Sequence, residues 1–368
     1  MTGRRVWTFL CVGLVVWMCA DGGQAAGDAA RGSNLYPAAQ WGRVTPEEAG
    51  WSAETVAEAQ AWSARVGSTA VMVVQHGLVV ASWGPVSDKL DLHSIRKSLL
   101  NALIGIAVRG HEITLTDTLA RLGIDDTPPS LTAAEKQATI ADLLEARSGV
   151  YHAALYETAD MAASRPPRGS HPPGTFWYYN NWDFNVLGTI YERAAGASIF
   201  NAFAVRIAAP IGMQDYTPLD GRYVTGAASD YPAYPFRMSA RDLARFALLY
   251  LRHGVWRGRS IVPGGWIDAS TTAYSVNERG FGYGYLWWTG PADRGVPAIG
   301  LPAGGFWAWG DLGQYALVVP SDDLILVNLS RSAPGPSTRQ IGHLLWLILS
   351  AAHAPDAGTD PESAPPAR

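Results

Sequence analysis

Cysteine and lysine are the scarcest residues of this chain, with two cysteines and three lysines among 368 residues. Both cysteines, Cys11 and Cys19, lie within the first 20 residues, so the rest of the chain has no disulfide, thiol nucleophile or thiolate metal site. The lysines compare with 25 arginines. Arginine keeps its proton in proteins, whereas a desolvated lysine can lose it. A site that needs a neutral amine as a base therefore cannot replace lysine by arginine.

Several other common functional signals are also missing. The net charge is only −4 and no basic stripe occurs, which argues against nucleic-acid binding. Gly-x-Ser-x-Gly is absent, which argues against a standard α/β-hydrolase. Neither a His-Glu-x-x-His cluster nor a phosphate loop occurs, so we predict no metal and no cofactor. With 48% hydrophobic and 16% charged residues, the chain is expected to be globular.

The N-terminus has the pattern of a secretory signal peptide. Arg4 and Arg5 precede an apolar stretch over 6–20, and 23–25 fits a small-x-small cleavage site. We predict a signal peptide over 1–25 and a periplasmic or secreted bacterial protein with no membrane span after its removal. A retained membrane anchor is the alternative, and lipid attachment at Cys19 stays open.

The order of expected elements indicates an α+β fold. The pattern favours an antiparallel sheet flanked by helices, with a helical lobe inserted between the two halves of an α/β lobe. We expect a domain over 38–354, made of an α/β lobe (38–110 plus 252–354) and a helical lobe (111–251), and a disordered tail over 355–368. Helices are expected over 52–65, 94–109, 139–146, 182–195, 239–251 and 337–353, and strands over 69–74, 78–83, 285–288, 304–309, 315–319 and 324–329.

Ser94 and Lys97 are the first candidates for chemistry. Residues three apart share a helix face, so the hydroxyl and the amine can meet if Ser94 starts its helix. Burial would lower the lysine pKa, and the neutral amine could then accept the serine proton. Ser-x-x-Lys alone is a weak signal, and a solvated lysine on a helix face is the alternative.

With its neighbouring motifs, the run 93–98 resembles the nucleophile helix of the β-lactamase-related serine hydrolases, nearer the class C, esterase and 6-aminohexanoate-dimer hydrolase branches. The run 142–149 resembles the loop after that family's second helix, and the similarity extends from about Val71 to about Leu329. The resemblance implies a β-lactamase/transpeptidase-like fold.

The family's second motif, Tyr-x-Asn, lies between a Pro-Gly and a Leu-Gly. Here two tyrosines and two asparagines follow one another, and the family spacing back from Gly188 selects Tyr179 and Asn181. The resemblance implies that Tyr179 shares a proton network with Lys97 as general base or acid, with its phenolate favoured by flanking cations. It also implies that Asn181 hydrogen-bonds Lys97 and the substrate.

The third motif departs from that of the β-lactamases. The stretch 307–314 resembles a Gly-x-x-Gly-Gln version, and Ala308 occupies the position of the lysine that helps to bind the β-lactam carboxylate. This argues against penicillins as main substrates. The resemblance places the backbone N–H of Asp311, which follows Gly310, with that of Ser94 as the oxyanion hole. Trp309 is a candidate for the substrate wall.

These residues together predict an exported serine hydrolase. Ser94 would form an acyl-enzyme with a small-molecule ester or amide, with Lys97 and Tyr179 as proton-transfer groups. Two alternatives stay open: a D-alanyl-D-alanine carboxypeptidase or β-lactamase acting on cell-wall-type substrates, and a non-catalytic binding module. The oligomeric state cannot be inferred. Five aromatic residues fall on the motif segments and form either a pocket wall or ordinary core: Trp177, Tyr178, Trp182, Trp307 and Trp309.

Overall fold

An eight-stranded antiparallel sheet carries the described part of the chain, in the order β2-β1-β12-β11-β10-β9-β8-β7. The structure is a computed structural model and describes residues 35–290, 296 and 299–353. The strands are β1 (Ala70–Gln75), β2 (Leu78–Trp83), β7 (Ser275–Val276), β8 (Gly282–Tyr283), β9 (Trp288–Thr289), β10 (Phe306–Gly310), β11 (Gln314–Val319) and β12 (Leu324–Leu329). Two small ribbons pair β3 (Leu90–Asp91) with β4 (Arg237–Met238), and β5 (Val255–Trp256) with β6 (Arg259–Ser260).

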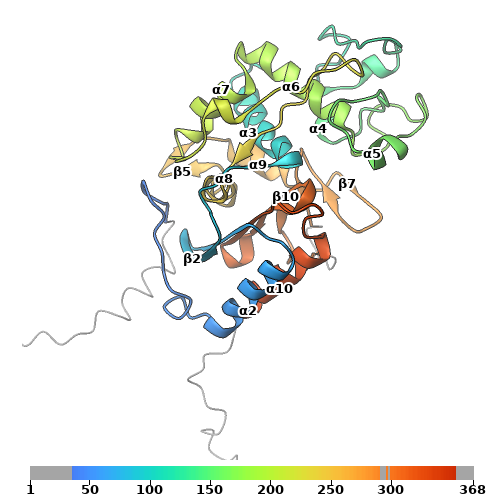
Figure 1. Ribbon diagram of the computed structural model, residues 1–368. Coiled ribbons are helices and arrows are strands. Elements are labelled where there is room, and N and C mark those ends of the chain that lie inside the picture. Colours follow the sequence, from blue (N-terminus) through green and yellow to red (C-terminus); the bar gives the residue numbers. More distant parts are fainter. Residues whose placement is uncertain (1–34, 291–295, 297–298, 354–368) are drawn as a thin grey trace, which may run out of the picture. The chain divides into compact units, whose positions relative to one another are not determined.

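The central strands are buried along their whole length and mostly apolar because helices cover both faces of the sheet. Every residue of β11 and β12 is buried, and Val73 of β1 lies opposite Leu326 of β12. Helix α8 packs against β1, β11 and β12, while α2 and α10 pack against each other on the other side of the sheet (Figure 1). The first and last helices of the described chain are therefore neighbours.

The helices begin at residues with good capping chemistry. Ser52, Ser239 and Ser337 each accept a hydrogen bond from the backbone N–H three residues on, which satisfies a free donor of the first turn. The α-helices are α2 (Ala53–Arg65), α3 (Arg96–Arg109), α4 (Ile140–Leu144), α5 (Ala159–Ala163), α6 (Asn181–Ala195), α7 (Ile199–Phe203), α8 (Ala240–Leu251), α9 (Gly264–Ser270) and α10 (Thr338–Ala352). Shorter helical turns are η1 (His93–Ile95), η2 (Glu135–Gln137), η3 (Ala204–Ala208, a π-helix), η4 (Pro218–Asp220), η5 (Asp311–Gly313) and η6 (Pro320–Asp322).

The predicted fold class, an antiparallel sheet flanked by helices, is confirmed, but the strand expected over 285–288 is wrong. That stretch turns between β8 and β9, and Leu286 has a φ of +60°. The peptide of Leu286 is held from two sides: its N–H donates to the Leu144 carbonyl, and its carbonyl accepts from the Ser98 hydroxyl at 2.9 Å. Contacts with distant helices thus bend a segment whose local pattern favours a strand.

The two ends of the chain lie outside the described residues. The predicted signal peptide over 1–25, the question of Cys19 and the predicted tail over 355–368 therefore stay predictions. No helix in the described ranges is long and apolar enough to span a bilayer. The described residues cluster as one compact unit, and the proposed lobe boundaries within 38–354 also stay a prediction.

Candidate active site

A tight turn presents Ser94 just before α3. Ser94 lies in η1, not at the start of the α-helix as predicted, and the preceding residue, His93, has a φ of +48°. The turn is held by the N–H of Leu92, which donates to the Phe236 carbonyl at 2.9 Å. A left-handed conformation at a residue with a side chain is strained by about 1–3 kcal/mol, and such strain tends to occur at functional sites.

The Ser94 hydroxyl and the Lys97 amine are in direct contact. Lys97 Nζ lies 2.7 Å from Ser94 Oγ, and the Lys97 residue is only 2% exposed. In the described structure, Lys97 has no carboxylate partner, whereas Lys89 pairs with Asp220 and Lys136 pairs with Asp125. Lys97 is therefore the lysine whose charge is not compensated.

Burial is the main cause that lowers the pKa of Lys97 well below its usual value, and the positive charge of Arg96 adds to it. A neutral amine within hydrogen-bond distance of a serine hydroxyl is chemically suited to accept its proton. The sequence analysis assigned no role to Arg96. Its position inside the Ser-x-x-Lys motif, directly before Lys97, is the feature that could have pointed to it.

Tyr179, and not Tyr178, faces this pair. The Tyr178 hydroxyl donates to the Met161 carbonyl at 2.6 Å, away from the serine. Lys97 Nζ lies 4.7 Å from the centre of the Tyr179 ring. Burial raises the pKa of Tyr179 to about 12, against the smaller opposing effects of the Ser94 hydroxyl and the Arg96 charge. The expected phenolate is therefore wrong, because desolvation outweighs the nearby cation and keeps the phenol protonated.

The two asparagines of the second motif have different structural roles. Asn180 is the N-cap of α6, and its side chain accepts a hydrogen bond from the N–H of Trp182. Asn181 is buried and donates through Nδ2 to the Tyr156 carbonyl at 2.6 Å. Its Oδ1 has no hydrogen-bond partner in the described structure. The predicted hydrogen bond between Asn181 and Lys97 is not formed: Lys97 Nζ contacts Ser94 Oγ instead, and the Asn181 oxygen that could accept from it has no partner among the described residues.

Gly310 brings the third motif against the turn that carries Ser94. A Cβ at Gly310 would lie 2.2 Å from the Leu92 carbonyl oxygen, a distance that no side chain allows. The end of β10 therefore approaches the nucleophile turn only because this residue is glycine. Asp311 begins the next turn, and its exposed carboxylate accepts from the N–H of Leu312 at 2.8 Å. The Asp311 side chain thus bonds to its neighbour in sequence. This is consistent with the prediction that the backbone N–H of Asp311, and not its side chain, serves the oxyanion hole.

Aromatic rings link the second motif to the third. The half-buried Trp309 lies 5.4 Å from Trp288, centre to centre, and Trp288 stacks on Tyr179 at 5.4 Å and 25°. Trp288 was not among the predicted residues, and the Trp-Trp pair 287–288 was the available signal. In contrast, Trp182 and Trp307 are fully buried and belong to the core. The motif tryptophans thus divide into fully buried core residues and residues connected to Tyr179 through the ring of Trp288.

Two cavities are lined by sequence neighbours of the predicted site residues. One of about 590 Å³ is lined by Phe176 and Trp177 and by the β7–β8 segment 275–279. The other, about 360 Å³, is lined by His93 and Leu312, which neighbour Ser94 and Asp311 in sequence. Both cavities are close in sequence to the predicted site residues.

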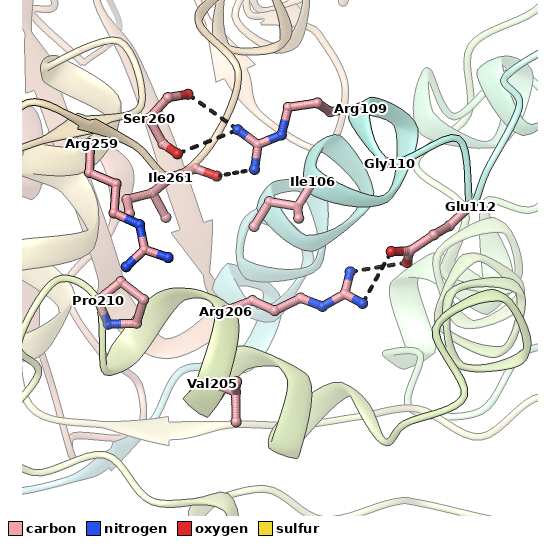
Figure 2. A pocket seen from close by; sticks show the side chains of 10 residues that line it. All are labelled: Ile106, Arg109, Gly110, Glu112, Val205, Arg206, Pro210, Arg259, Ser260 and Ile261. Atoms are coloured by element: carbon pink, nitrogen blue, oxygen red, sulfur yellow. Dashed lines mark hydrogen bonds and ion pairs between the residues drawn. The ribbon is translucent and has the colours of Figure 1, made fainter.

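A third cavity, about 390 Å³, lies at the opposite end of α3 (Figure 2). Two of its three guanidinium groups have protein partners: Arg206 contacts Glu112, and Arg109 donates to Ser260 and to the Ile261 carbonyl, while no such bond is drawn for Arg259 in Figure 2. None of the predicted site residues lines this cavity or either of the other two. The direct contact between Lys97 and Ser94 is what places the candidate chemistry at the N-terminal end of α3. In the described ranges, no three or more His, Cys, Asp or Glu side chains are grouped to hold a metal ion.

Comparisons with known proteins identify a family and a fold. A family model described as Beta-lactamase matches residues 53–350. A curated relative, the 6-aminohexanoate-dimer hydrolase of Paenarthrobacter ureafaciens, is 28% identical over 207 residues, 52% of this chain and 48% of that protein. An uncharacterized protein of Alkalihalophilus pseudofirmus is 29% identical over 124 residues, 32% of this chain and 37% of its own length. The matched regions thus span less than half of each curated relative.

Solved structures show the same fold. A penicillin-binding protein homologue from Pyrococcus abyssi aligns with a TM-score of 0.60 and 18% identity, over 81% of this chain and 77% of its own. A penicillin-binding protein homologue from Caulobacter crescentus aligns with a TM-score of 0.60 and 17% identity, over 81% and 97%. These likenesses establish the β-lactamase/transpeptidase-like fold.

Proposed function

Because the chain belongs to the β-lactamase family, we propose that it is a serine hydrolase that cleaves an ester or an amide through an acyl-enzyme on Ser94. The observation that carries this proposal is the contact of 2.7 Å between Lys97 Nζ and Ser94 Oγ. A desolvated amine next to a hydroxyl forms the base-activated nucleophile that acyl transfer requires.

The proposed reaction has two halves. Lys97 accepts the Ser94 proton while Oγ bonds to the carbonyl carbon, and the resulting oxyanion is bound by the N–H groups of Ser94 and Asp311. Each such donor typically contributes about 10²–10³ in rate. The protonated Tyr179 gives its proton to the leaving alkoxide or amine and regains one from Lys97. Water then attacks the acyl carbon while the neutral Lys97 accepts its proton, and Lys97 returns that proton to the leaving Ser94 oxygen.

The walls of the site favour an apolar acyl group. Trp288 lies beside Tyr179, Trp309 lies beside Trp288, and Trp177 lines the cavity of about 590 Å³. Ala308 is fully buried on β10 and offers no charge to a β-lactam carboxylate. These features support an ester or amide over a penicillin. Similarity to the 6-aminohexanoate-dimer hydrolase supports a linear amide as a second candidate.

A fluorophosphonate probe tests the nucleophile. Folded wild-type protein should be labelled at Ser94, and a Ser94→Ala variant should not. Absence of labelling in folded wild-type protein would contradict the hydrolase proposal and favour a binding module. We propose export as well, to be tested by N-terminal sequencing of the protein secreted from a bacterial host.

A substrate panel then separates the enzyme classes. It contains p-nitrophenyl esters of increasing acyl length, the linear 6-aminohexanoate dimer, nitrocefin and a D-Ala-D-Ala peptide. We expect the highest kcat/KM on an ester or on the linear amide. Preference for nitrocefin or for the peptide would instead assign the chain to β-lactamase or D-alanyl-D-alanine carboxypeptidase activity.

A further inference from the structure

Arg96 is a buried cation with very few partners. The residue is fully buried, and no carboxylate lies within ion-pair distance of it in the described structure. Its Nη2 donates to Asn185 Oδ1 at 3.0 Å, while its Nε and Nη1 have no partner there. The amide of Asn185 is oriented by its own bond to the Leu155 carbonyl. One neutral acceptor therefore serves the whole guanidinium group.

Aromatic rings supply the rest of its surroundings. Arg96 Cζ lies 4.3 Å from the centre of the Tyr234 ring and 5.8 Å from that of Tyr156. The Tyr234 ring is held by a hydrogen bond from its hydroxyl to the Phe184 carbonyl. Contacts with ring faces stabilise a cation only in part. The charged Arg96 side chain thus occupies a position where an apolar side chain would cost less free energy of desolvation.

Arg245 shows what a structural buried arginine looks like in this protein. It too is fully buried, but its guanidinium donates to three backbone carbonyls, those of Ile211, Ala38 and Ala39. Such bonds hold separate segments together. Arg96 makes no comparable set of bonds in the described structure, so cross-linking does not explain its charge.

We propose that Arg96 is a positioning residue whose permanent positive charge keeps the adjacent Lys97 in its neutral, proton-accepting form. This inference rests on the proposed function, in which Lys97 is the base. Two adjacent buried cations repel each other strongly because water does not screen them. Arginine does not release its proton, so this repulsion adds to the effect of burial and favours release of the lysine proton.

The other titratable groups around Lys97 leave Arg96 as its dominant charged neighbour. Burial raises the pKa of Tyr179 and of Asp183, which favours the neutral phenol and the neutral acid. Burial also lowers the pKa of His93, which favours its neutral ring. The carboxylate of Asp311 is exposed to water and therefore screened. Three further tyrosines surround Arg96 or Tyr179 and have raised pKa values: Tyr156, Tyr234 and Tyr283.

Direct titration of Lys97 tests the inference without any substrate. The chain has only three lysines, so protein carrying lysine labelled at Cε and Nζ should give three side-chain NMR signals. Lys89→Arg and Lys136→Arg variants assign the other two. We expect the Lys97 titration midpoint to rise by one pH unit or more in Arg96→Gln and Arg96→Met, about a tenfold change in the ratio of charged to neutral amine.

Stability and labelling complete the test. We expect Arg96→Met to be at least as stable as wild type, while the control Arg245→Met is destabilised and leaves the Lys97 midpoint unchanged. The acidic limb of the fluorophosphonate rate–pH profile should move upward with the Lys97 midpoint in the Arg96 variants.

An unchanged Lys97 midpoint in either folded Arg96 variant would overturn the inference, as would failure of both variants to fold. If wild-type Ser94 is not labelled but the midpoint still moves, the proposed function fails while the role of Arg96 in holding Lys97 neutral stands.

Discussion

Lys97 Nζ lies 2.7 Å from Ser94 Oγ, and in the described structure no carboxylate shares that amine. The other two lysines are paired with aspartates near the surface. All three side chains are lysines, so the difference lies in their surroundings. Burial lowers the pKa of Lys97 and makes it the candidate base.

Lys97→Arg should abolish base catalysis, because a guanidinium group cannot accept the Ser94 proton. We expect kcat/KM on the best p-nitrophenyl ester to fall by about 10²–10⁴-fold. Lys136→Arg, in which the ion pair with Asp125 can be kept, is the matched control and should retain wild-type activity. Full activity of Lys97→Arg would exclude the lysine as the base.

Lys97 should also make stability depend on pH. In the unfolded chain Lys97 keeps its proton up to about its ordinary pKa of 10.5, whereas in the folded chain it releases the proton at lower pH. The unfolded state therefore binds more protons in that window, and this contribution to stability rises with pH. The stability advantage of Lys97→Met over wild type should be largest at low pH and shrink toward about pH 10. Urea unfolding at several pH values measures it, and a difference that is constant with pH would contradict it.

Tyr179→Phe should lower kcat by about 10²–10⁴-fold if the phenol transfers a proton. Since the pKa of Tyr179 is about 12, this tyrosine should cause no alkaline loss of activity below that value. Tyr178→Phe is the matched control, with a change in kcat of about twofold or less and a loss of about 1 kcal/mol of stability from the bond to Met161. Equal effects of the two substitutions would remove Tyr179 from the mechanism.

Gly310→Ala should separate β10 from the nucleophile turn, because the new Cβ would meet the Leu92 carbonyl at 2.2 Å. We expect a loss of about 1–3 kcal/mol in stability and a fall of about 10²-fold in the rate of Ser94 labelling. Gly265→Ala, where the new Cβ meets nothing within 4 Å, should change neither quantity much. Normal labelling of Gly310→Ala would show that the third motif does not contribute to the oxyanion site.

Trp309→Ala should raise KM for esters with long acyl chains by about tenfold and leave short esters nearly unchanged, because the side chain would contact the acyl group. Trp346→Ala removes an exposed tryptophan on α10 and should leave KM unchanged for all esters. An unchanged KM across the whole ester series in Trp309→Ala would place Trp309 in the core rather than in the substrate wall.

Most of the long strands and helices could be predicted from local sequence patterns. The hairpin β1–β2, strands β11 and β12 and helices α2, α3, α8 and α10 appear close to their predicted ranges because their apolar runs and serine caps are local signals. The turn at Leu286 could not be predicted, since Leu144 and Ser98 impose it from distant segments. The two-residue strands β3 and β4 are defined only by their pairing with each other, and so short a segment has no recognisable pattern in the sequence.

The spacing of Ser94 and Lys97 predicted that their side chains could meet, because residues three apart lie on the same face of a helical turn. The sequence also contains the family motifs that point to Tyr179 and Gly310. The protonation of the site, in contrast, depends on how distant segments pack around it. Burial by distant segments keeps the Tyr179 phenol protonated and leaves Lys97 beside the charge of Arg96 without a carboxylate. Desolvation depends on everything that packs around a group, and no local spacing encodes it.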